Sequence, residues 1–391
     1  MTCATPAVRG VDPGVVGSGE RSRCSTEVGT LVGTVFAVVF AITALGCADE
    51  TFRAPAIGVS TAPSAELHLL EWSIDTITAV GVLEGPEDFQ FVGLREASVL
   101  PGAEFSLLDM RGGRVAFFDS AGQHLKSIQS RGEGPGEFQL PVAHAVSKEG
   151  DLFVLDRQLA RLSHFRLTAG EMKFVGMRRV NYRLTSLCVL NDTLWFGGIV
   201  DGRLAHRVDE QGTIEVSIGT PPEIEGIERL GDFGEALAYP QMVRPKMHCD
   251  DESGLLILAS LSHPRVQAYR GSGEVVWSMD LPGFTSLQFE RTESGGLRDF
   301  SHPERGSHLL FSLVPWLEGQ VLIQYEVRRD EPARDGASPT SMDSRIIDLA
   351  TGEVLSRSDQ LPPILGGNGN LLVISGQELF PQALLVRRLQ Q

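Results

Sequence analysis

Three internal copies of one pattern constrain the fold of this chain more than any other feature. Each copy has an apolar run, a polar turn, an arginine followed by an aliphatic residue, an aromatic residue three positions further on, a Gly-containing turn and a second apolar run. The copies start at Glu104, Asp151 and Leu255, their arginines are Arg114, Arg161 and Arg265, and their aromatic residues are Phe118, Phe165 and Tyr269. Weaker copies surround Arg203 and Arg345. A supersecondary unit that recurs at this spacing predicts an array or a ring of similar units.

The units are predicted to be small antiparallel sheets. Apolar and polar residues alternate between Gly, Asp or Asn turns about every eight to twelve residues, which is typical of short strands. A four-stranded sheet buries its faces only against copies of itself, and a ring of such sheets protects the strand edges. We therefore expect an all-β fold, a six-bladed β-propeller of four-stranded antiparallel blades.

The blade count and the closure of the ring follow from the predicted domain, residues 66–391. That length corresponds to about 54 residues per blade for six blades and about 47 for seven, and the repeats favour six. The last unit, near the C-terminus, lacks an outer strand, which residues 67–82 could supply. We expect strands from both termini to close the ring.

One long stretch carries a resemblance to a known family. The residues FSLLDMRGGRVAFFDSAGQHLKSIQSRGEGPGEFQLP, from Phe105 to Pro141, resemble the NHL-type six-bladed propellers found among bacterial secreted proteins and lipoproteins. In that family an aspartate ends the second strand, an arginine or asparagine opens the third, and a GxGxGxF motif leads to the next blade. The resemblance implies the architecture and says little about chemistry.

The N-terminus reads as a targeting segment. Three arginines precede an apolar run, residues 31–45, that is shorter than the roughly 20 residues of a membrane span. The residues TALGC, which end at Cys47, resemble a bacterial lipobox. This resemblance implies a lipoprotein-type signal over 1–46 and lipidation of Cys47, followed by a flexible tether over 47–65. Ala48 then points to the outer membrane, facing the periplasm or the cell surface. An uncleaved signal anchor or an ordinary secretory cleavage are the alternatives.

Charge and cysteine content exclude some functions. The formal net charge is −16, with 34 Lys and Arg residues that form no dense cluster, so we exclude nucleic acid as a partner. Outside the signal and Cys47, only Cys188 and Cys249 remain. We place them on inner strands of the third and fourth blades and favour two buried free thiols over a disulfide.

The glycine-rich stretch RGEGPGEFQLP, residues 131–141, is predicted to be structural. A phosphate-binding loop needs a lysine or a helix dipole aimed at the anion, whereas this stretch holds Glu133 and Glu137 and precedes a strand. We interpret it as a connector between blades. Asp109 with Arg114, and Asp156 with Arg161, recur five residues apart, and we expect both pairs to brace loops.

Two histidines form the best candidate for chemistry. His144 and His248 are 104 residues apart, as are Arg161 and Arg265, so they occupy equivalent positions on inner strands of two blades that are not neighbours. Inner strands line the channel of a propeller, where imidazoles can bind a divalent metal such as Ca²⁺ or Zn²⁺. The alternative is that both side chains pack between blades.

Three insertions interrupt the repeat, starting near Thr220, Gly283 and Arg328. The first is acidic, and its candidate binding residues are Glu223, Glu225, Glu228, Asp232, Phe233 and Glu235. We predict a binding or scaffolding module held at the cell envelope for a protein, peptide or glycan, without assigning an enzyme activity. The alternative is a metal-dependent hydrolase or lyase that works in the central channel with His144 and His248 as ligands.

Overall fold

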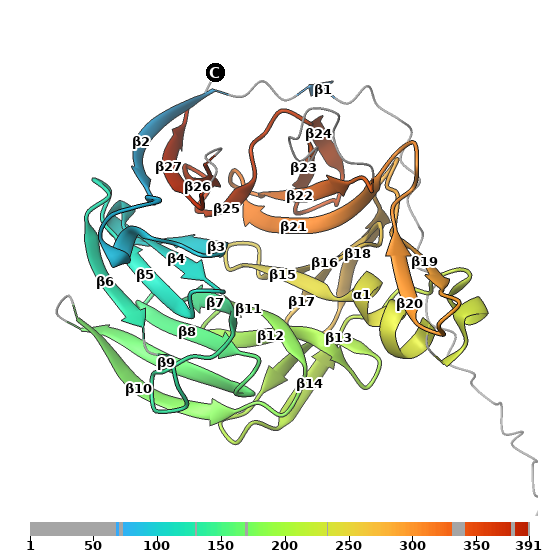
Figure 1. Ribbon diagram of the computed structural model, residues 1–391, viewed down its shortest axis with the longest axis horizontal. Coiled ribbons are helices and arrows are strands. Elements are labelled where there is room, and N and C mark those ends of the chain that lie inside the picture. Colours follow the sequence, from blue (N-terminus) through green and yellow to red (C-terminus); the bar gives the residue numbers. More distant parts are fainter. Residues whose placement is uncertain are drawn as a thin grey trace, which may run out of the picture. The chain divides into compact units, whose positions relative to one another are not determined.

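Six antiparallel sheets follow one another around a ring in the computed structural model (Figure 1). The structure describes residues 68–69, 73–129, 131–168, 171–232, 234–330, 341–376 and 380–389. The inner strands β3, β7, β11, β15, β21 and β25 contact one another in that order, and β25 contacts β3. The predicted six-bladed β-propeller is therefore confirmed, whereas the predicted signal, Cys47 and the tether lie outside the described residues.

Each blade runs from an inner to an outer strand. Blade 1 contains β3 (Leu94–Val99), β4 (Phe105–Asp109), β5 (Arg114–Phe118) and β6 (His124–Gln129). Blade 2 contains β7 (Pro141–Val146), β8 (Asp151–Asp156), β9 (Arg161–Thr168) and β10 (Glu171–Arg179). Blade 3 contains β11 (Leu184–Leu190), β12 (Thr193–Val200), β13 (Arg203–Val208) and β14 (Ile214–Ile218).

The second half of the ring repeats this order. Blade 4 contains β15 (Pro245–Asp250), β16 (Leu255–Ser260), β17 (Arg265–Arg270) and β18 (Val275–Asp280). Blade 5 contains β21 (Ser307–Pro315), β22 (Gln320–Arg328), β23 (Ser341–Asp348) and β24 (Val354–Ser358), and β1 (His68–Leu69) adds a parallel strand to β24. Blade 6 contains β25 (Ile364–Gly367), β26 (Leu371–Ser375) and β27 (Ala383–Arg388).

Strands from both ends of the described chain close the ring. The outer strand of blade 6 is β2 (Ile74–Val80), which pairs antiparallel with β27, so Val80 lies opposite Ala383. The sequence predicted this closure. Because β2 leads directly into blade 1 and β27 belongs to blade 6, this pairing ties the two ends of the ring together.

The core is divided among the contacts between blades. Each of the six interfaces between neighbouring blades holds one cluster of buried apolar side chains. Between blades 6 and 1, for example, Phe105 and Phe118 of blade 1 pack against Val373 and Leu385 of blade 6, and all four are fully buried. Because side chains alternate between the two faces of a sheet, each blade contributes to two clusters, one on either face.

The repeated aspartates and arginines brace the loop between the second and third strands of a blade, as the sequence predicts, and they also hold the connectors between blades. The buried Asp156 carboxylate accepts hydrogen bonds from the N–H groups of Gln139, Leu140, Gln158 and Leu159. Arg161 donates to the carbonyl groups of Glu133, Gly134 and Glu137, all within the glycine-rich connector. The connector is thus held through its backbone.

Two glycines of this connector have separate reasons to be glycine. Gly136 has φ = 78°, in the left-handed region. At Gly132, a Cβ atom would lie 2.0 Å from Oε2 of Glu137, whose carboxylate accepts the Gly134 N–H at 2.7 Å. The connector therefore folds closely around the Glu137 carboxylate, and a side chain at Gly132 would collide with it.

The structure corrects the expectation for the two cysteines. Cys188 of β11 and Cys249 of β15 form a disulfide, with their Cα atoms 5.6 Å apart. The expectation of free thiols was wrong because the distance between neighbouring inner strands cannot be derived from the sequence spacing of 61 residues. The disulfide joins the inner strands of blades 3 and 4.

Loss of this disulfide is expected to destabilise the ring measurably. The chain-entropy model assigns roughly 4 kcal/mol to a closed loop of about this length. We expect dithiothreitol, or the double substitution Cys188→Ala/Cys249→Ala, to lower the free energy of unfolding by roughly 2–4 kcal/mol in urea titrations. The double variant should not respond to dithiothreitol. Identical unfolding midpoints of the wild type with and without reductant would contradict the assignment.

Candidate functional site

A central cavity of about 540 Å³ is lined by all six inner strands. Its lining extends from Glu96 of β3 and Lys246 of β15 to the turns that follow the inner strands, such as Pro101–Ala103. Both predicted metal ligands, His144 of β7 and His248 of β15, belong to this lining. The structure therefore brings the two histidines to one cavity, on blades 2 and 4.

An ion pair crosses the channel at one end of this cavity. Nζ of Lys246 lies 3.5 Å from Oε1 of Glu96, and the two residues come from blades 4 and 1, which lie opposite each other in the ring. Only 16% of the Lys246 side chain is exposed. Burial lowers the pKa of Lys246 to about 8, although the Glu96 carboxylate acts in the opposite direction. This amine therefore gives up its proton more easily than an ordinary lysine.

His144 is held between blades 1 and 2. Its Nε2 lies 2.9 Å from the hydroxyl oxygen of Ser106 and 3.2 Å from that of Ser98, and its Nδ1 faces Oε2 of Glu96 at 3.9 Å. Burial lowers the pKa of His144, although Glu96 again opposes the shift. A neutral imidazole that bonds two hydroxyl groups is well suited to a packing role, which is the alternative that the sequence left open.

His248 has an unoccupied nitrogen. Its Nε2 is buried and has no hydrogen-bond partner among the described residues, and burial lowers the pKa of the imidazole to about 4. Neutral imidazole nitrogen is the form that binds metals. Among the described residues, however, no three His, Cys, Asp or Glu side chains come together as a group that could hold a metal ion. The metal site at His144 and His248 stays a prediction.

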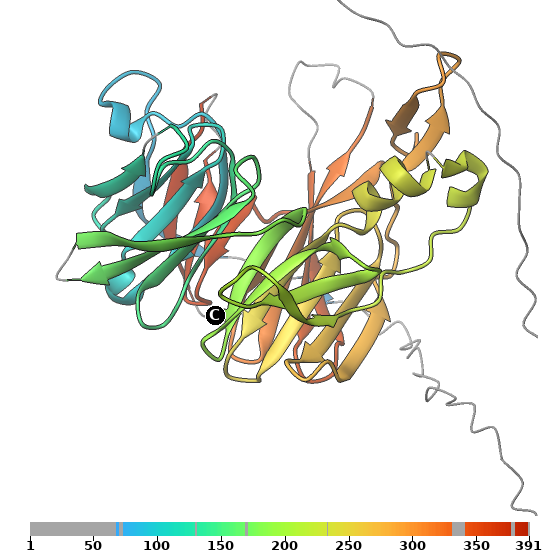
Figure 2. The ribbon, with the colours of Figure 1, turned by 90° about the horizontal axis from the view of Figure 1, so that it is seen from below.

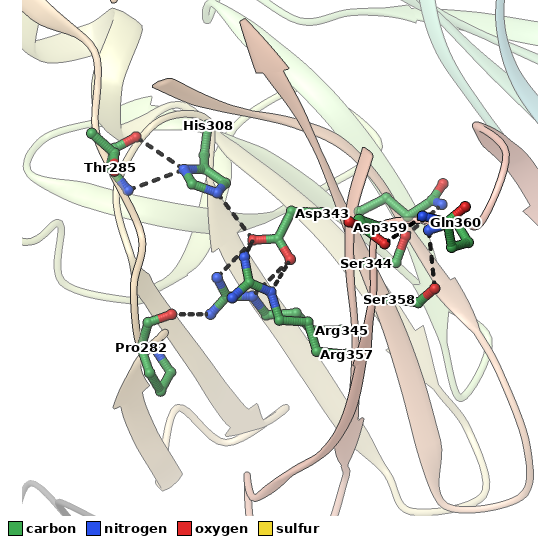
Figure 3. A network of polar contacts seen from close by, with 11 residues as sticks. Pro282, Thr285, His308, Asp343, Ser344, Arg345, Arg357, Ser358, Asp359 and Gln360 are labelled. Carbon is green, nitrogen blue, oxygen red and sulfur yellow. Dashed lines mark hydrogen bonds and ion pairs between the residues drawn. The ribbon is translucent and has the colours of Figure 1, made fainter. Parts of the chain in front are cut away.

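A second polar network lies between blades 4 and 5 (Figure 3). The Asp343 carboxylate on β23 accepts hydrogen bonds from Nε2 of His308 at 3.0 Å, from Arg345 at 2.7 Å and from Arg357 at 2.8 Å. Burial tends to raise the pKa of Asp343, but the bonds from His308 and from Arg345 outweigh it and hold this pKa far below its usual range. Asp343 is therefore a permanent, fully paired anion.

This network fixes the start of the second insertion. Arg345 donates to the Pro282 carbonyl at 2.7 Å, and Nδ1 of His308 accepts the Thr285 N–H at 3.0 Å. The Phe284 ring stacks on the His308 ring with centroids 4.8 Å apart. Because both nitrogens of His308 are engaged, its Nε2–H donates to Asp343. Arg345 donates to a connector carbonyl, as Arg161 does in blade 2. We therefore interpret the arrangement as a structural brace.

The insertions leave the ring on one face, which we call the insertion face: the side on which the inner strands begin. The first, between β14 and β15, forms η3 (Ile227–Leu230), η4 (Gly234–Ala238) and α1 (Tyr239–Val243), and the second contains the hairpin of β19 (Gln288–Arg291) and β20 (Leu297–Phe300). Figure 2 shows both on the same side of the blades. The third leaves after β22 on this side, and its residues 331–340 lie outside the described part.

Direct contacts tie the insertions to one another. Arg291 of β19 donates to the Leu230 carbonyl of the first insertion at 3.1 Å. Arg328, at the end of β22, forms an ion pair with Asp299 of β20 at 2.6 Å, and the Ser301 N–H donates to Asp330 at 2.7 Å. The insertion face is therefore one connected surface where the structure describes it.

A groove of about 530 Å³ lies between the first two insertions. Its apolar lining comes from both of them and consists of Ile224, Ile227, Leu230, Met242, Leu287, Phe289 and Phe300. Of the predicted acidic residues, Glu225 lines the groove, and Glu223, Glu228 and Asp232 lie on the same insertion. All four are exposed and form no ion pair within the described residues. Phe233 and the side chain of Glu235 lie outside the described part.

Sequence reasoning missed the partners that join distant blades. Lys246 lies two residues before His248, so strand alternation could have placed both on one side of β15. Nothing in the spacing, however, indicates that Lys246 reaches Glu96, 150 residues earlier. The contact between His308 and Asp343 was also not predicted, because the second insertion separates His308 from the repeat pattern.

Comparisons with known proteins agree with the fold. Residues 80–196 match the family model DUF5128, described as a 6-bladed beta-propeller. A Bacteroides fragilis protein whose name records an expected export superposes with a TM-score of 0.52 at 12% identity, over 82% of this chain and 95% of that chain. A member of the duf4221 family from Bacteroides vulgatus gives a TM-score of 0.51 at 8% identity, over 82% and 98%. No sequence among the curated proteins matches the chain.

Proposed function

From the six-bladed β-propeller fold, we propose that this protein is an exported binding module that recognises its partner at the insertion face. The groove between the first two insertions is the observation that carries the proposal. It combines apolar walls with exposed carboxylates that form no ion pair within the described residues, while the ring is braced by the disulfide and by buried Asp and Arg side chains. A rigid scaffold with added loops is a common arrangement for recognition.

The chemistry of the groove favours a peptide or protein segment among the possible partners. Isoleucine, leucine and phenylalanine side chains suit an apolar anchor residue, and the four exposed carboxylates suit basic residues that flank such an anchor. A glycan would be expected to meet more hydroxyl and amide donors than this apolar lining offers. We therefore take a peptide segment with an apolar anchor and flanking Lys or Arg as the preferred ligand.

Selection from a displayed library of random 12-residue peptides tests this proposal. We expect enrichment of peptides with an aromatic or aliphatic residue next to Lys or Arg, and weaker binding at higher salt. Phe289→Ala should weaken the selected peptides about tenfold or more, because it removes an anchor contact from the groove wall. Phe174→Ala, a matched change on the outer strand β10, should have no effect. Failure to enrich such peptides, or equal binding by Phe289→Ala, would refute the groove as the binding site.

Anchoring at the cell envelope belongs to the same proposal. The apolar run over 31–45 and the lipobox-like residues at Cys47 support export and lipidation. The Cys188–Cys249 disulfide supports an oxidising compartment outside the cytoplasm. No helix in the described part of the chain is long and apolar enough to cross a membrane.

Metabolic labelling with radioactive palmitate tests the anchor. The full-length chain expressed in a Gram-negative bacterium should incorporate the label and sediment with the outer membrane. Cys47→Ala should abolish both, because the thiol that would carry the lipid is gone, whereas Cys24→Ala should leave both unchanged. Equal labelling of wild type and Cys47→Ala would contradict lipidation at this residue.

A metal-dependent hydrolase or lyase in the channel is a second candidate, favoured by one observation. His248 belongs to the cavity lining, and its buried Nε2 has no hydrogen-bond partner in the part of the chain that the structure describes. If a metal binds there, two imidazoles favour Zn²⁺ over Ca²⁺, since Ca²⁺ prefers oxygen ligands. In that case His144 would offer its Nδ1, which is also buried without a hydrogen-bond partner among the described residues, while its Nε2 keeps the bonds to Ser98 and Ser106.

Metal analysis of the purified domain distinguishes the two candidates. A channel enzyme should hold Zn²⁺ at one ion per chain by elemental mass spectrometry, and His144→Ala/His248→Ala should lose it because both ligands are removed. His302→Ala, on the second insertion, is the control and should keep it. Less than stoichiometric metal in the wild type, or unchanged metal in the double variant, would exclude this candidate.

A further inference from the structure

Three arginines lie where the inner strands begin on the insertion face. Arg244 directly precedes β15, and its carbonyl accepts the Leu261 N–H at 2.9 Å. Arg157 directly follows β8, and its N–H donates to the carbonyl of Leu140, the residue before β7, at 3.0 Å. Arg95 lies in β3 at an irregularity in its pairing with β4. These backbone positions bring all three to the mouth of the channel.

None of the three guanidinium groups has a partner within the described part of the chain. Arg95, Arg157 and Arg244 form no side-chain hydrogen bond and no ion pair there. The nearby carboxylates are already engaged: Asp156 with four backbone N–H groups, and Glu96 with Lys246 and His144. Arg157 is exposed, whereas Arg95 and Arg244 are half-buried.

The cluster repels itself. The pKa of Arg244 is lowered by burial and by the positive charges of Arg95 and Arg157, so these groups lie near enough to act on one another. The positive charges of Arg95 and Arg244 also lower the pKa of Lys246, which lies just inside the channel. Cations that are gathered and partly desolvated without a counter-charge destabilise the folded chain.

The braces of the ring provide the contrast. Arg114, Arg161 and Arg345 donate to connector carbonyls, and each is nearly fully buried. Structural arginines of this protein therefore have identifiable partners. The cluster at the mouth has none among the residues that the structure describes, in a chain whose net charge is −16.

We infer that Arg95, Arg157 and Arg244 form a binding site for an oxyanion group with two or more negative charges, of the phosphate or polycarboxylate class, at the mouth of the channel. Guanidinium groups bind such oxyanions through paired, charge-assisted hydrogen bonds. Lys246 lies below the site and adds positive charge to it. The acidic remainder of the protein repels extended polyanions, so the site suits a small ligand or a single anionic group. This inference adds a ligand class to the binding module proposed above and uses the same face.

Inorganic phosphate, sulfate and citrate, each titrated at constant ionic strength with sodium chloride as the balance, test the site on the protein alone. We expect saturable binding by calorimetry and a matching rise in melting temperature. Arg244→Gln and Arg95→Gln should each weaken binding about tenfold, because each removes charge-assisted contacts. Arg270→Gln, which changes an exposed arginine at the far end of β17, should bind as the wild type does.

A second readout separates an anion site from a structural role. Without added anion and at low salt, Arg244→Gln should melt at the same temperature as the wild type or higher, because it relieves repulsion. A structural arginine would lower the melting temperature. The exposed Arg157→Gln gives an independent variant if Arg244→Gln fails to fold.

The possible outcomes are distinct. Tighter binding of phosphate and sulfate than of citrate assigns a tetrahedral oxyanion, and the reverse order assigns a polycarboxylate. Absence of saturable binding, or equal binding by all the arginine variants, overturns the inference. Phe289→Ala should bind the anions normally, so failure of the groove and failure of this site can be told apart.

Discussion

Face-to-face burial between neighbouring blades is the interaction on which the rest of this structure depends. A single four-stranded sheet of this protein exposes two apolar faces, and each face is covered only by the next sheet of the ring. Stability is therefore shared by six similar interfaces and requires that the ring be closed. The pairing of β2 with β27 meets this requirement, because without it blade 6 would lack its outer strand and the interface with blade 1 would be incomplete.

Buried charges in this ring have two different consequences. Where an arginine meets an aspartate and backbone carbonyls, as Arg114 does beside Asp109, the charge holds a connector in place. Blade 5 has a related arrangement, in which Asp343 and Arg345 both lie on β23. His308 bonds Asp343 and also accepts the Thr285 N–H, so it adds a second contact that holds the second insertion. A charge that lacks such partners costs free energy and so points to a ligand, which is why the arginines at the channel mouth differ in meaning from those in the braces.

The sequence predicted the regular part of this molecule and little of the part that departs from the repeat. The phase set by Arg114 and Arg161 placed the strands, the braces, the closing strand and the inner-strand positions of His144 and His248. These features are local or periodic, so one chain segment is enough to show them. The disulfide, the Glu96–Lys246 pair and the groove depend on distances between different blades or insertions, and no pattern along the chain encodes those distances.

The two faces of the ring differ in how easily their loops accept additional residues, and this difference explains why the candidate binding sites lie on one face. Between an inner strand and the second strand of its blade the chain makes short turns, such as the one that follows β7, where Lys148 pairs with Asp251 in the corresponding turn of blade 4. On the insertion face the connectors are already fixed by buried Asp–Arg braces, so additional residues can be inserted there without disturbing the interfaces between blades. The same face gathers the starts of the inner strands, and with them the arginines that surround the channel. A ligand bound at the channel mouth would therefore lie on the same face as the groove between the insertions, and two separate contacts on one face would give more selectivity than either contact alone.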